Sequence, residues 1–269
     1  MDEATAVTPV TVDPTPSGDV AAEHKPYIRL GTLKDLDKMV DVACHAFNRD
    51  PVFNYMGNLK EFALDPSQQE WKDRALWTRF LHKGSFLLNA RVTVVVDPAV
   101  KDADGEPKIV ASAIWQPPKK RLAVWKVRLI LRAGVVPILK RWKWTGFTRI
   151  TDEYQDTAHK MAKECFKAKG IKKPDVDDSW YLVQMFFPCT GLMSLLMREA
   201  FEYAPNDVYT LEATTAASRD QYAHLGYELP IPIPLGQGKC DKDGLQAKGG
   251  EATGFEIWSM AKWPKEQEK

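Results

Sequence analysis

Two strand-like runs joined by a tight turn constrain the fold of this 269-residue chain more than any other feature. The first run, ARVTVVVDP, is dense in β-branched residues, and the turn that follows, KDADGEP, carries Asp104-Gly105. The second run, KIVASAIWQPP, stops at Pro117-Pro118. β-Branched residues favour strands, and Asp-Gly between two such runs is typical of a β-hairpin. The pattern therefore predicts an antiparallel pair and does not fit a doubly wound parallel sheet.

Further strand-like runs extend this hairpin into a mixed order. Strands are predicted near residues 27–30, 90–97, 108–115, 180–187, 207–213, 227–233 and 254–262. The last two form a second hairpin, and the polar segment between them, 240–250, is expected to be a mobile loop. The run SWYLVQMFF is nearly all apolar, which is typical of a central strand covered on both faces.

Helical patterns lie between these strands. Thr32 can cap a first helix, whose apolar residues recur at helical spacing up to Phe47, and Pro51 is expected to end it. Further helices are expected at about 66–82, 191–204 and 218–226. The predicted fold class is α+β, with a single mixed, mostly antiparallel sheet flanked by helices.

The chain divides into a tail and one domain. Residues 1–25 are rich in Pro, Thr, Ala, Val and Asp without apolar periodicity, which predicts a disordered tail. Residues 26–269 are expected to form one domain, with a helical insertion at about 119–177. The nine tryptophans and the 44% hydrophobic content indicate a compact globule.

Charge and cysteine content argue against several classes of protein. The 37 Lys and Arg nearly cancel the 36 Asp and Glu, so the net charge points to no nucleic-acid partner. The four cysteines form no CxxC pair, and no zinc-ligand cluster is apparent, so no metal is expected. There is no secretory signal and no run of about 18 apolar residues. We therefore expect a cytoplasmic protein without a membrane span.

One segment departs from this charge balance. Between Pro117 and Ile150 lie ten basic residues and no acidic one: Lys119, Lys120, Arg121, Lys126, Arg128, Arg132, Lys140, Arg141, Lys143 and Arg149. Tryptophans are interleaved with them. This mixture is typical of a site for an anionic surface or a phosphate-bearing ligand. It also fits a helical insertion whose tryptophans pack inward and whose cations face water, and that interpretation is the commoner for helices.

Several motifs together resemble the GCN5-related N-acetyltransferase family, in particular its puromycin acetyltransferase-like members. KPYIRLGTLKDLDKMVDVACHAFNRDP is similar to the family's first strand and helix, ASAIWQPP to its third strand and SWYLVQMFFP to its fourth. YTLEATTAASRDQYAHLGYE matches the family's L-E-x-(S/T)…N-x-x-x-Y-x-x-x-G-F segment and is the most specific of these. The resemblance covers about residues 25–264 and is weak in the insertion.

The resemblance implies an acetyl-CoA-dependent N-acetyltransferase acting on a small amine. Tyr222 matches the tyrosine that protonates the departing thiolate, a role that suits a phenol protonated at neutral pH. Ser218 stands where the family usually has an asparagine that contacts the coenzyme. Glu212 is the candidate general base. From the residues alone, Tyr222 also fits a core tyrosine, and Glu212 an ion-paired or solvated carboxylate.

The resemblance also places the two substrates. Backbone N–H groups of the fourth strand, at Met185, Phe186 and Phe187, would polarise the thioester carbonyl. The amine would lie among side chains of the first helix and of two strands: Phe47, Asp50, Phe53, Tyr55, Trp115 and Trp258.

The coenzyme loop departs from the family pattern. The family binds pyrophosphate with a Gln/Arg-x-x-Gly-x-Gly/Ala loop, whereas FFPCTGLMS is shorter and has one glycine, Gly191. Cys189, Thr190 and Gly191 are left as candidate N–H donors. Cys189 could alternatively be a nucleophile or a small apolar residue. The short loop motivates an alternative function, a catalytically impaired binding or scaffold protein. No GxGxxG follows a strand, so a dehydrogenase is unsupported.

Overall fold

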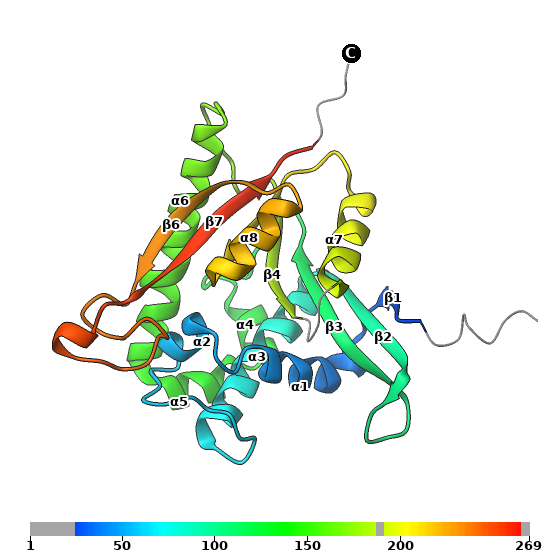
Figure 1. Ribbon diagram of the computed structural model, residues 1–269, viewed down its shortest axis with the longest axis horizontal. Coiled ribbons are helices and arrows are strands. Elements are labelled where there is room, and N and C mark those ends of the chain that lie inside the picture. The colour runs from blue at the N-terminus through cyan, green and yellow to red at the C-terminus, as the bar shows by residue number, and fades with distance from the viewer. Residues whose placement is uncertain (1–24, 187–190, 265–269) are drawn as a thin grey trace, which may run out of the picture.

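A seven-stranded sheet organises the computed structural model, which describes residues 25–186 and 191–264 (Figure 1). The strands are β1 (Tyr27–Leu30), β2 (Arg91–Lys101), β3 (Pro107–Gln116), β4 (Trp180–Phe186), β5 (Tyr209–Ala213), β6 (Glu228–Leu235) and β7 (Phe255–Lys262). Their order is β1-β2-β3-β4-β5-β7-β6, and only the β4–β5 pair is parallel. The predicted α+β fold with two hairpins and a central β4 is therefore confirmed. Apart from Lys25, the predicted tail lies outside the described residues.

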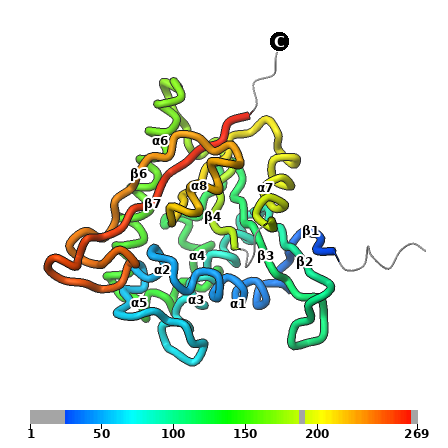
Figure 2. Tube along the Cα trace, viewed as in Figure 1, coloured from blue at the N-terminus to red at the C-terminus, as the bar shows by residue number. Residues whose placement is uncertain are grey.

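Helices cover both faces of this sheet. They are α1 (Leu36–Ala46), α2 (Pro51–Met56), α3 (Gln69–Leu87), α4 (Val127–Ala133), α5 (Val135–Thr148), α6 (Asp156–Ala168), α7 (Leu192–Tyr203) and α8 (Ala216–His224), with the π-helical segment η2 (Arg149–Gln155) before α6. Leu196 and Met197 of α7 pack on one face with Leu182, and Met39 of α1 packs on the other with Phe186. In the insertion, α4 and α5 contact α3, and α6 lies along β6 and β7 (Figure 2). No helix in the described ranges is long and apolar enough to cross a membrane.

The first helical region begins as predicted and ends differently. The Thr32 side chain caps a short 3-10 turn, Leu33–Asp35, and the Asp35 side chain bonds back to the Thr32 backbone N–H. Pro51 was expected only to end a helix, but α1 already ends at Ala46 and Pro51 begins α2. Proline suits this position because the first N–H groups of a helix have no partner within it. Asp50 thus becomes the N-cap of α2.

The segment between β6 and β7 packs against α2 rather than lying free. Asn54 donates its side-chain N–H to the backbone oxygen of Asp243 at 2.9 Å, and the Gln246 backbone N–H donates to Leu59 O at 2.7 Å. Gly244 makes this approach possible. Its φ is +77°, and a Cβ there would lie 2.1 Å from the Pro51 oxygen. The segment that was expected to be a mobile loop therefore packs against α2 and supports its start at Pro51.

We predict that Gly244→Ala destabilises the protein by more than the backbone conformation alone requires. A left-handed residue with a Cβ costs about 1–2 kcal/mol, and here a contact with Pro51 is added. Gly238→Ala is the matched control, because its φ is +73° and its Cβ would meet nothing within 4 Å. Chemical unfolding of both variants measures the difference, and equal losses would contradict the bracing role of the segment.

Candidate active site

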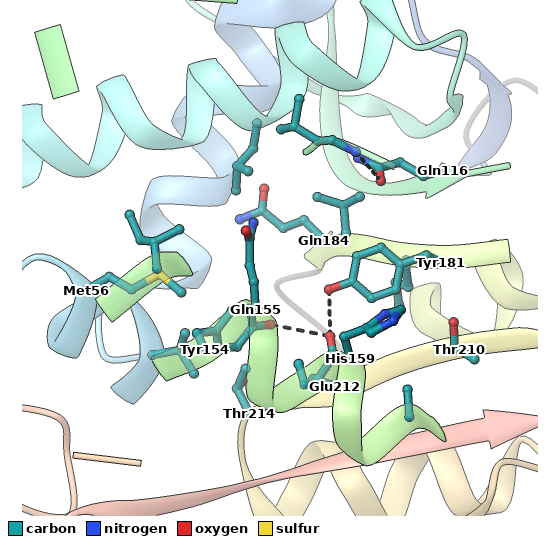
Figure 3. Close-up of a pocket in the computed structure, with 18 of the residues that line it drawn as sticks. Met56, Gln116, Tyr154, Gln155, His159, Tyr181, Gln184, Thr210, Glu212 and Thr214 are labelled. Carbon is teal, nitrogen blue, oxygen red and sulfur yellow. Dashed lines mark hydrogen bonds between the residues drawn. The ribbon is translucent and has the colours of Figure 1, made fainter. Parts of the chain in front are cut away.

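The strands β4 and β5 part soon after they pair. In their parallel ladder, Trp180 pairs with Tyr209 and Tyr181 pairs with Thr210, and the described residues beyond these do not pair. A cavity of about 950 Å³ lies at this parting, lined by residues 181–186 of β4 and by Glu212 and Thr214 (Figure 3). Unpaired strand ends thus supply part of the wall of this cavity.

A bulge in β4 sets which side chains face the cavity together. Ile114 of β3 is opposite Gln184, and Trp115 is opposite Leu182, so Val183 is an extra residue on β4. Side chains alternate along a strand, and one inserted residue shifts that alternation. Tyr181 and Gln184, three positions apart, therefore lie on the same side of the sheet, and Figure 3 shows both of them at the cavity.

Two tyrosines converge on the carboxylate of Glu212 (Figure 3). The Tyr181 hydroxyl donates to Oε2 at 2.6 Å, and the Tyr154 hydroxyl, from η2, lies 3.4 Å from the same oxygen. Loss of hydration raises the pKa of Glu212 above its usual value, and the two hydroxyls and the charge of Arg121 oppose that rise. Glu212 is thus a carboxylate held in place by hydrogen bonds, with a greater proton affinity than an exposed one.

A second acid, Asp50, lines the same cavity and is buried. Its Oδ1 accepts the backbone N–H groups of Val52 and Phe53 at 2.9 and 3.2 Å, and its Oδ2 accepts the Thr214 hydroxyl at 2.6 Å. Burial raises the pKa of Asp50, and these hydrogen bonds act against it. Asp50 therefore fixes the start of α2 against the turn after β5. Nearby, the rings of Phe47 and Phe53 stack at 5.1 Å and form an apolar part of the wall.

Gln184 carries a hydrogen-bond donor that the described protein does not use. Its Oε1 accepts the Nε2–H of buried His82 at 2.5 Å, while its own Nε2 is buried and has no partner among the described residues. Burial lowers the pKa of His82 to about 4, so its imidazole is neutral near pH 7. Gln184 lines the cavity, and its side-chain amide is available to a bound molecule. Buried polar groups ordinarily have partners, and the place of Gln184 in the cavity wall makes this unpaired N–H a candidate contact for a bound molecule.

The residues predicted for the coenzyme form another part of this wall. Tyr222 of α8 is buried, lines the cavity with Met185 and Phe186, and finds no hydrogen-bond partner for its hydroxyl among the described residues. Burial raises the pKa of Tyr222 above its usual value, so the phenol stays protonated. Ser218 also lines the cavity, but its hydroxyl belongs to a capping box with Thr215.

The loop predicted to hold the pyrophosphate is described only at its end. Gly191 is the N-cap of α7, with φ +100°, and it is exposed. Phe187, Cys189 and Thr190 lie outside the described residues.

Three residues predicted for the amine site do not line the cavity. Tyr55 is buried, donates its hydroxyl to Glu153 and lies under the guanidinium of Arg149. Trp115 is fully buried in the core on the α7 side of the sheet, edge-on to Tyr209. Trp258 lies under the Arg219 guanidinium at 4.8 Å. The cavity is instead completed by three residues that the sequence had not suggested, Tyr154, Tyr181 and Gln184, and His82 holds Gln184 from behind the cavity wall.

A metal site has no support in the geometry described. No group of three or more His, Cys, Asp or Glu side chains that could hold an ion occurs within residues 25–186 and 191–264.

No protein-family model and no curated protein sequence matches the chain. Among solved structures, it is similar to a histone acetyltransferase HPA2 and related acetyltransferase from Corynebacterium glutamicum, with a TM-score of 0.50 and 18% identity over 91% of this chain and 99% of the other. An arylalkylamine N-acetyltransferase 2 from Aedes aegypti has a TM-score of 0.49 and 15% identity, over 89% and 99% of the two chains. The first similarity confirms the fold that the sequence motifs implied, that of the GCN5-related N-acetyltransferases.

We predict that His82 makes the stability of the protein depend on pH. Its pKa is about 4 in the folded state and 6.5 by reference, so the unfolded state binds more protons between these values. Stability therefore falls as the pH drops from 6.5 to 4, by up to about 3 kcal/mol from this group. Urea unfolding of the protein and of His82→Gln across this range should show their stabilities converging at low pH. A difference between the two proteins that stays constant across this range would contradict the prediction.

Proposed function

We propose that the protein is an acyltransferase that moves the acetyl group of acetyl-CoA to a small amine. The main support for the proposal is that a candidate base and a candidate acid line the same cavity. Glu212, a hydrogen-bonded carboxylate of raised pKa, and Tyr222, a protonated phenol without a described partner, both line it. Acyl transfer to an amine needs a group to take a proton from the nitrogen and a group to give one to the leaving sulfur.

The residues present fit acetyl-CoA at the parting of β4 and β5. The coenzyme supplies a thioester whose carbonyl carbon accepts the amine nitrogen and whose sulfur leaves. Met185 and Phe186 would present their backbone to the acetyl end, and Ser218 lies on the same wall. Gly191 caps the N-terminus of α7, where free N–H groups and the helix dipole favour a pyrophosphate. Cys189 and Thr190 would complete that anion site.

Glu212 would take the proton that the amine loses. An amine arrives as an ammonium ion at neutral pH, and a carboxylate facing a cavity attracts it. Tyr181 and Tyr154 hold Oε2 of Glu212, which fixes the direction in which the carboxylate accepts the proton, directly or through water. The raised pKa makes Glu212 a stronger base than an exposed glutamate, which suits proton transfer near neutral pH.

Tyr222 would supply the proton for the departing sulfur. Its raised pKa keeps the hydroxyl protonated, and its burial in the core against Tyr227, at 5.6 Å between the ring centroids, fixes the ring. The free N–H of Gln184 would bind a polar group of the amine or of the acetyl carbonyl. The stacked Phe47 and Phe53, with Trp77 and Tyr154, favour an amine with an apolar body.

Calorimetric titration with acetyl-CoA tests the proposal directly, followed by measurement of free thiol released in the presence of amines. Binding together with amine-dependent thiol release is the expected result. Protein that neither binds acetyl-CoA nor releases thiol would overturn the proposal and favour the binding or scaffold alternative that the short loop before Gly191 suggests.

We predict that Tyr222→Phe lowers turnover about 10²- to 10⁴-fold where proton transfer limits the rate. The affinity for acetyl-CoA should change little, because the phenol acts when the thiolate leaves. Tyr227→Phe is the matched control, since that tyrosine packs edge-on to Tyr222 and does not line the cavity. Steady-state kinetics and coenzyme titration of both variants separate the two effects. Equal turnover in the two variants would make Tyr222 a core residue only.

We predict that Glu212→Gln removes the acid limb of the pH profile of kcat/KM. A base must be deprotonated to act, so activity should rise with pH through the pKa of Glu212, and glutamine lacks this titration. Tyr181→Phe provides the opposite test. Its hydrogen bond lowers the pKa of Glu212, so its loss should move the acid limb to higher pH without abolishing it. An unchanged limb in both variants would exclude Glu212 as the base.

A further inference from the structure

The helices α4 and α5, with the turn before them, carry seven of the fifteen exposed large apolar side chains among the described residues. They are Val124, Trp125, Val127, Leu131, Val136, Leu139 and Trp144, to which we refer, with the exposed cations Arg128, Arg132, Lys140 and Lys143, as the α4–α5 surface. Trp125 is 76% exposed and Trp144 74%. The expectation that the tryptophans of this segment pack inward therefore holds only for Trp142, which lies against Trp77 with ring centroids 5.4 Å apart.

Packing within the protein does not account for these exposed side chains. The inner sides of α4 and α5 already contact α3, since Ala133 and Ile138 belong to the same buried cluster as Trp77 and Phe80. The apolar residues of the α4–α5 surface thus lie outside the core. Several exposed apolar residues close together on one helical segment often mark an interaction site.

The charges on the surface identify the kind of partner. No acidic residue occurs between Pro117 and Ile150. Some cations of the segment are used internally: Arg141 pairs with Asp73 at 2.9 Å, and Arg149 donates to Tyr55 O at 2.6 Å. Arg128, Arg132 and Lys140 have no partner among the described residues. A surface that combines free cations with exposed tryptophan and aliphatic side chains is complementary to anionic head groups above an apolar layer.

We propose that the α4–α5 surface docks the protein on an anionic lipid membrane. The cations would contact the head groups, and Trp125, Trp144 and the exposed aliphatic side chains would enter the interfacial layer. Nucleic acid would satisfy the cations but would leave Val127, Leu131 and Leu139 in water. A second copy of the chain that used the same surface would set two surfaces without acidic residues against each other, which like charges disfavour.

The cavity of the active site opens beside this surface. Val124 and Trp125 belong to the α4–α5 surface and also line the cavity. Docking would therefore bring the cavity mouth to the bilayer. Binding of the α4–α5 surface to a membrane does not depend on acetyl transfer in the cavity.

Flotation of the full-length protein with lipid vesicles tests the proposal. Vesicles of phosphatidylcholine with phosphatidylserine are compared with vesicles of phosphatidylcholine alone, each at low and high salt. We expect binding to the anionic vesicles and weakening by salt. Each basic residue near such a surface contributes roughly a fivefold change in binding, so replacing Arg128, Arg132 and Lys140 by Gln should weaken binding on the order of a hundredfold.

Matched variants separate the charge from the apolar contribution. Replacing the exposed Lys172, Lys173 and Lys248 by Gln removes the same charge elsewhere and should leave most of the binding intact. Replacing Trp125 and Trp144 by Ser should weaken binding at both salt concentrations without lowering the melting temperature, because both side chains are exposed. The proposal would be overturned if the Arg128, Arg132 and Lys140 variant and the Lys172, Lys173 and Lys248 variant lost vesicle binding equally. It would also be overturned if the tryptophan variant lost no binding.

Two other outcomes would also contradict it. Binding of a duplex oligonucleotide by a protein that ignores anionic vesicles would assign the surface to nucleic acid. Concentration-dependent dimerisation that the tryptophan variant abolishes, in a protein that ignores vesicles, would assign it to a second copy of the chain.

Discussion

The parting of β4 and β5 is the constraint on which the rest of the site depends. Two parallel strands that stay paired leave no room between them, whereas here the ladder ends at Tyr181 and Thr210. The backbone groups beyond that point lose their strand partners, and unpaired buried backbone groups are costly. Such an opening is reasonable where a ligand completes the hydrogen bonding. The cavity and the unused amide of Gln184 lie at the same opening.

The position of Gln184 shows how the fold supports this opening. The bulge at Val183 turns Gln184 to the same side as Tyr181, and His82 of α3 holds its amide oxygen. Since burial lowers the pKa of His82, the imidazole remains a neutral donor across the neutral range and adds no charge to the cavity. Helix α3 therefore orients a side chain of the central strand as well as covering the sheet.

The sheet and its hairpins could be predicted from the sequence because they follow local rules. β-Branched runs, the Asp104-Gly105 turn and the Thr32 cap each determine nearby backbone, and the sheet and both hairpins followed from them. The site was only partly predictable. Glu212, Tyr222 and Asp50 line the cavity, but the partners of Glu212 come from β4 and from η2, far away in sequence. Gln184 is the one side-chain amide in the apolar run SWYLVQMFF. A polar residue in a strand expected to be buried could have been predicted to belong to a site.

The insertion between β3 and β4 connects the inside of the site with the outside of the molecule. Its η2 segment brings Tyr154 to Glu212, while its α4 and α5 helices expose the cationic and apolar surface. Both regions depend on the same core, because Ile150 at the start of η2 packs in one cluster with Ala133 and Ile138. Closely packed interiors leave little space for independent rearrangement, so the positions of α4, α5 and η2 are set together. The outer cationic surface and the hydrogen bond from Tyr154 to Glu212 therefore depend on the same buried cluster.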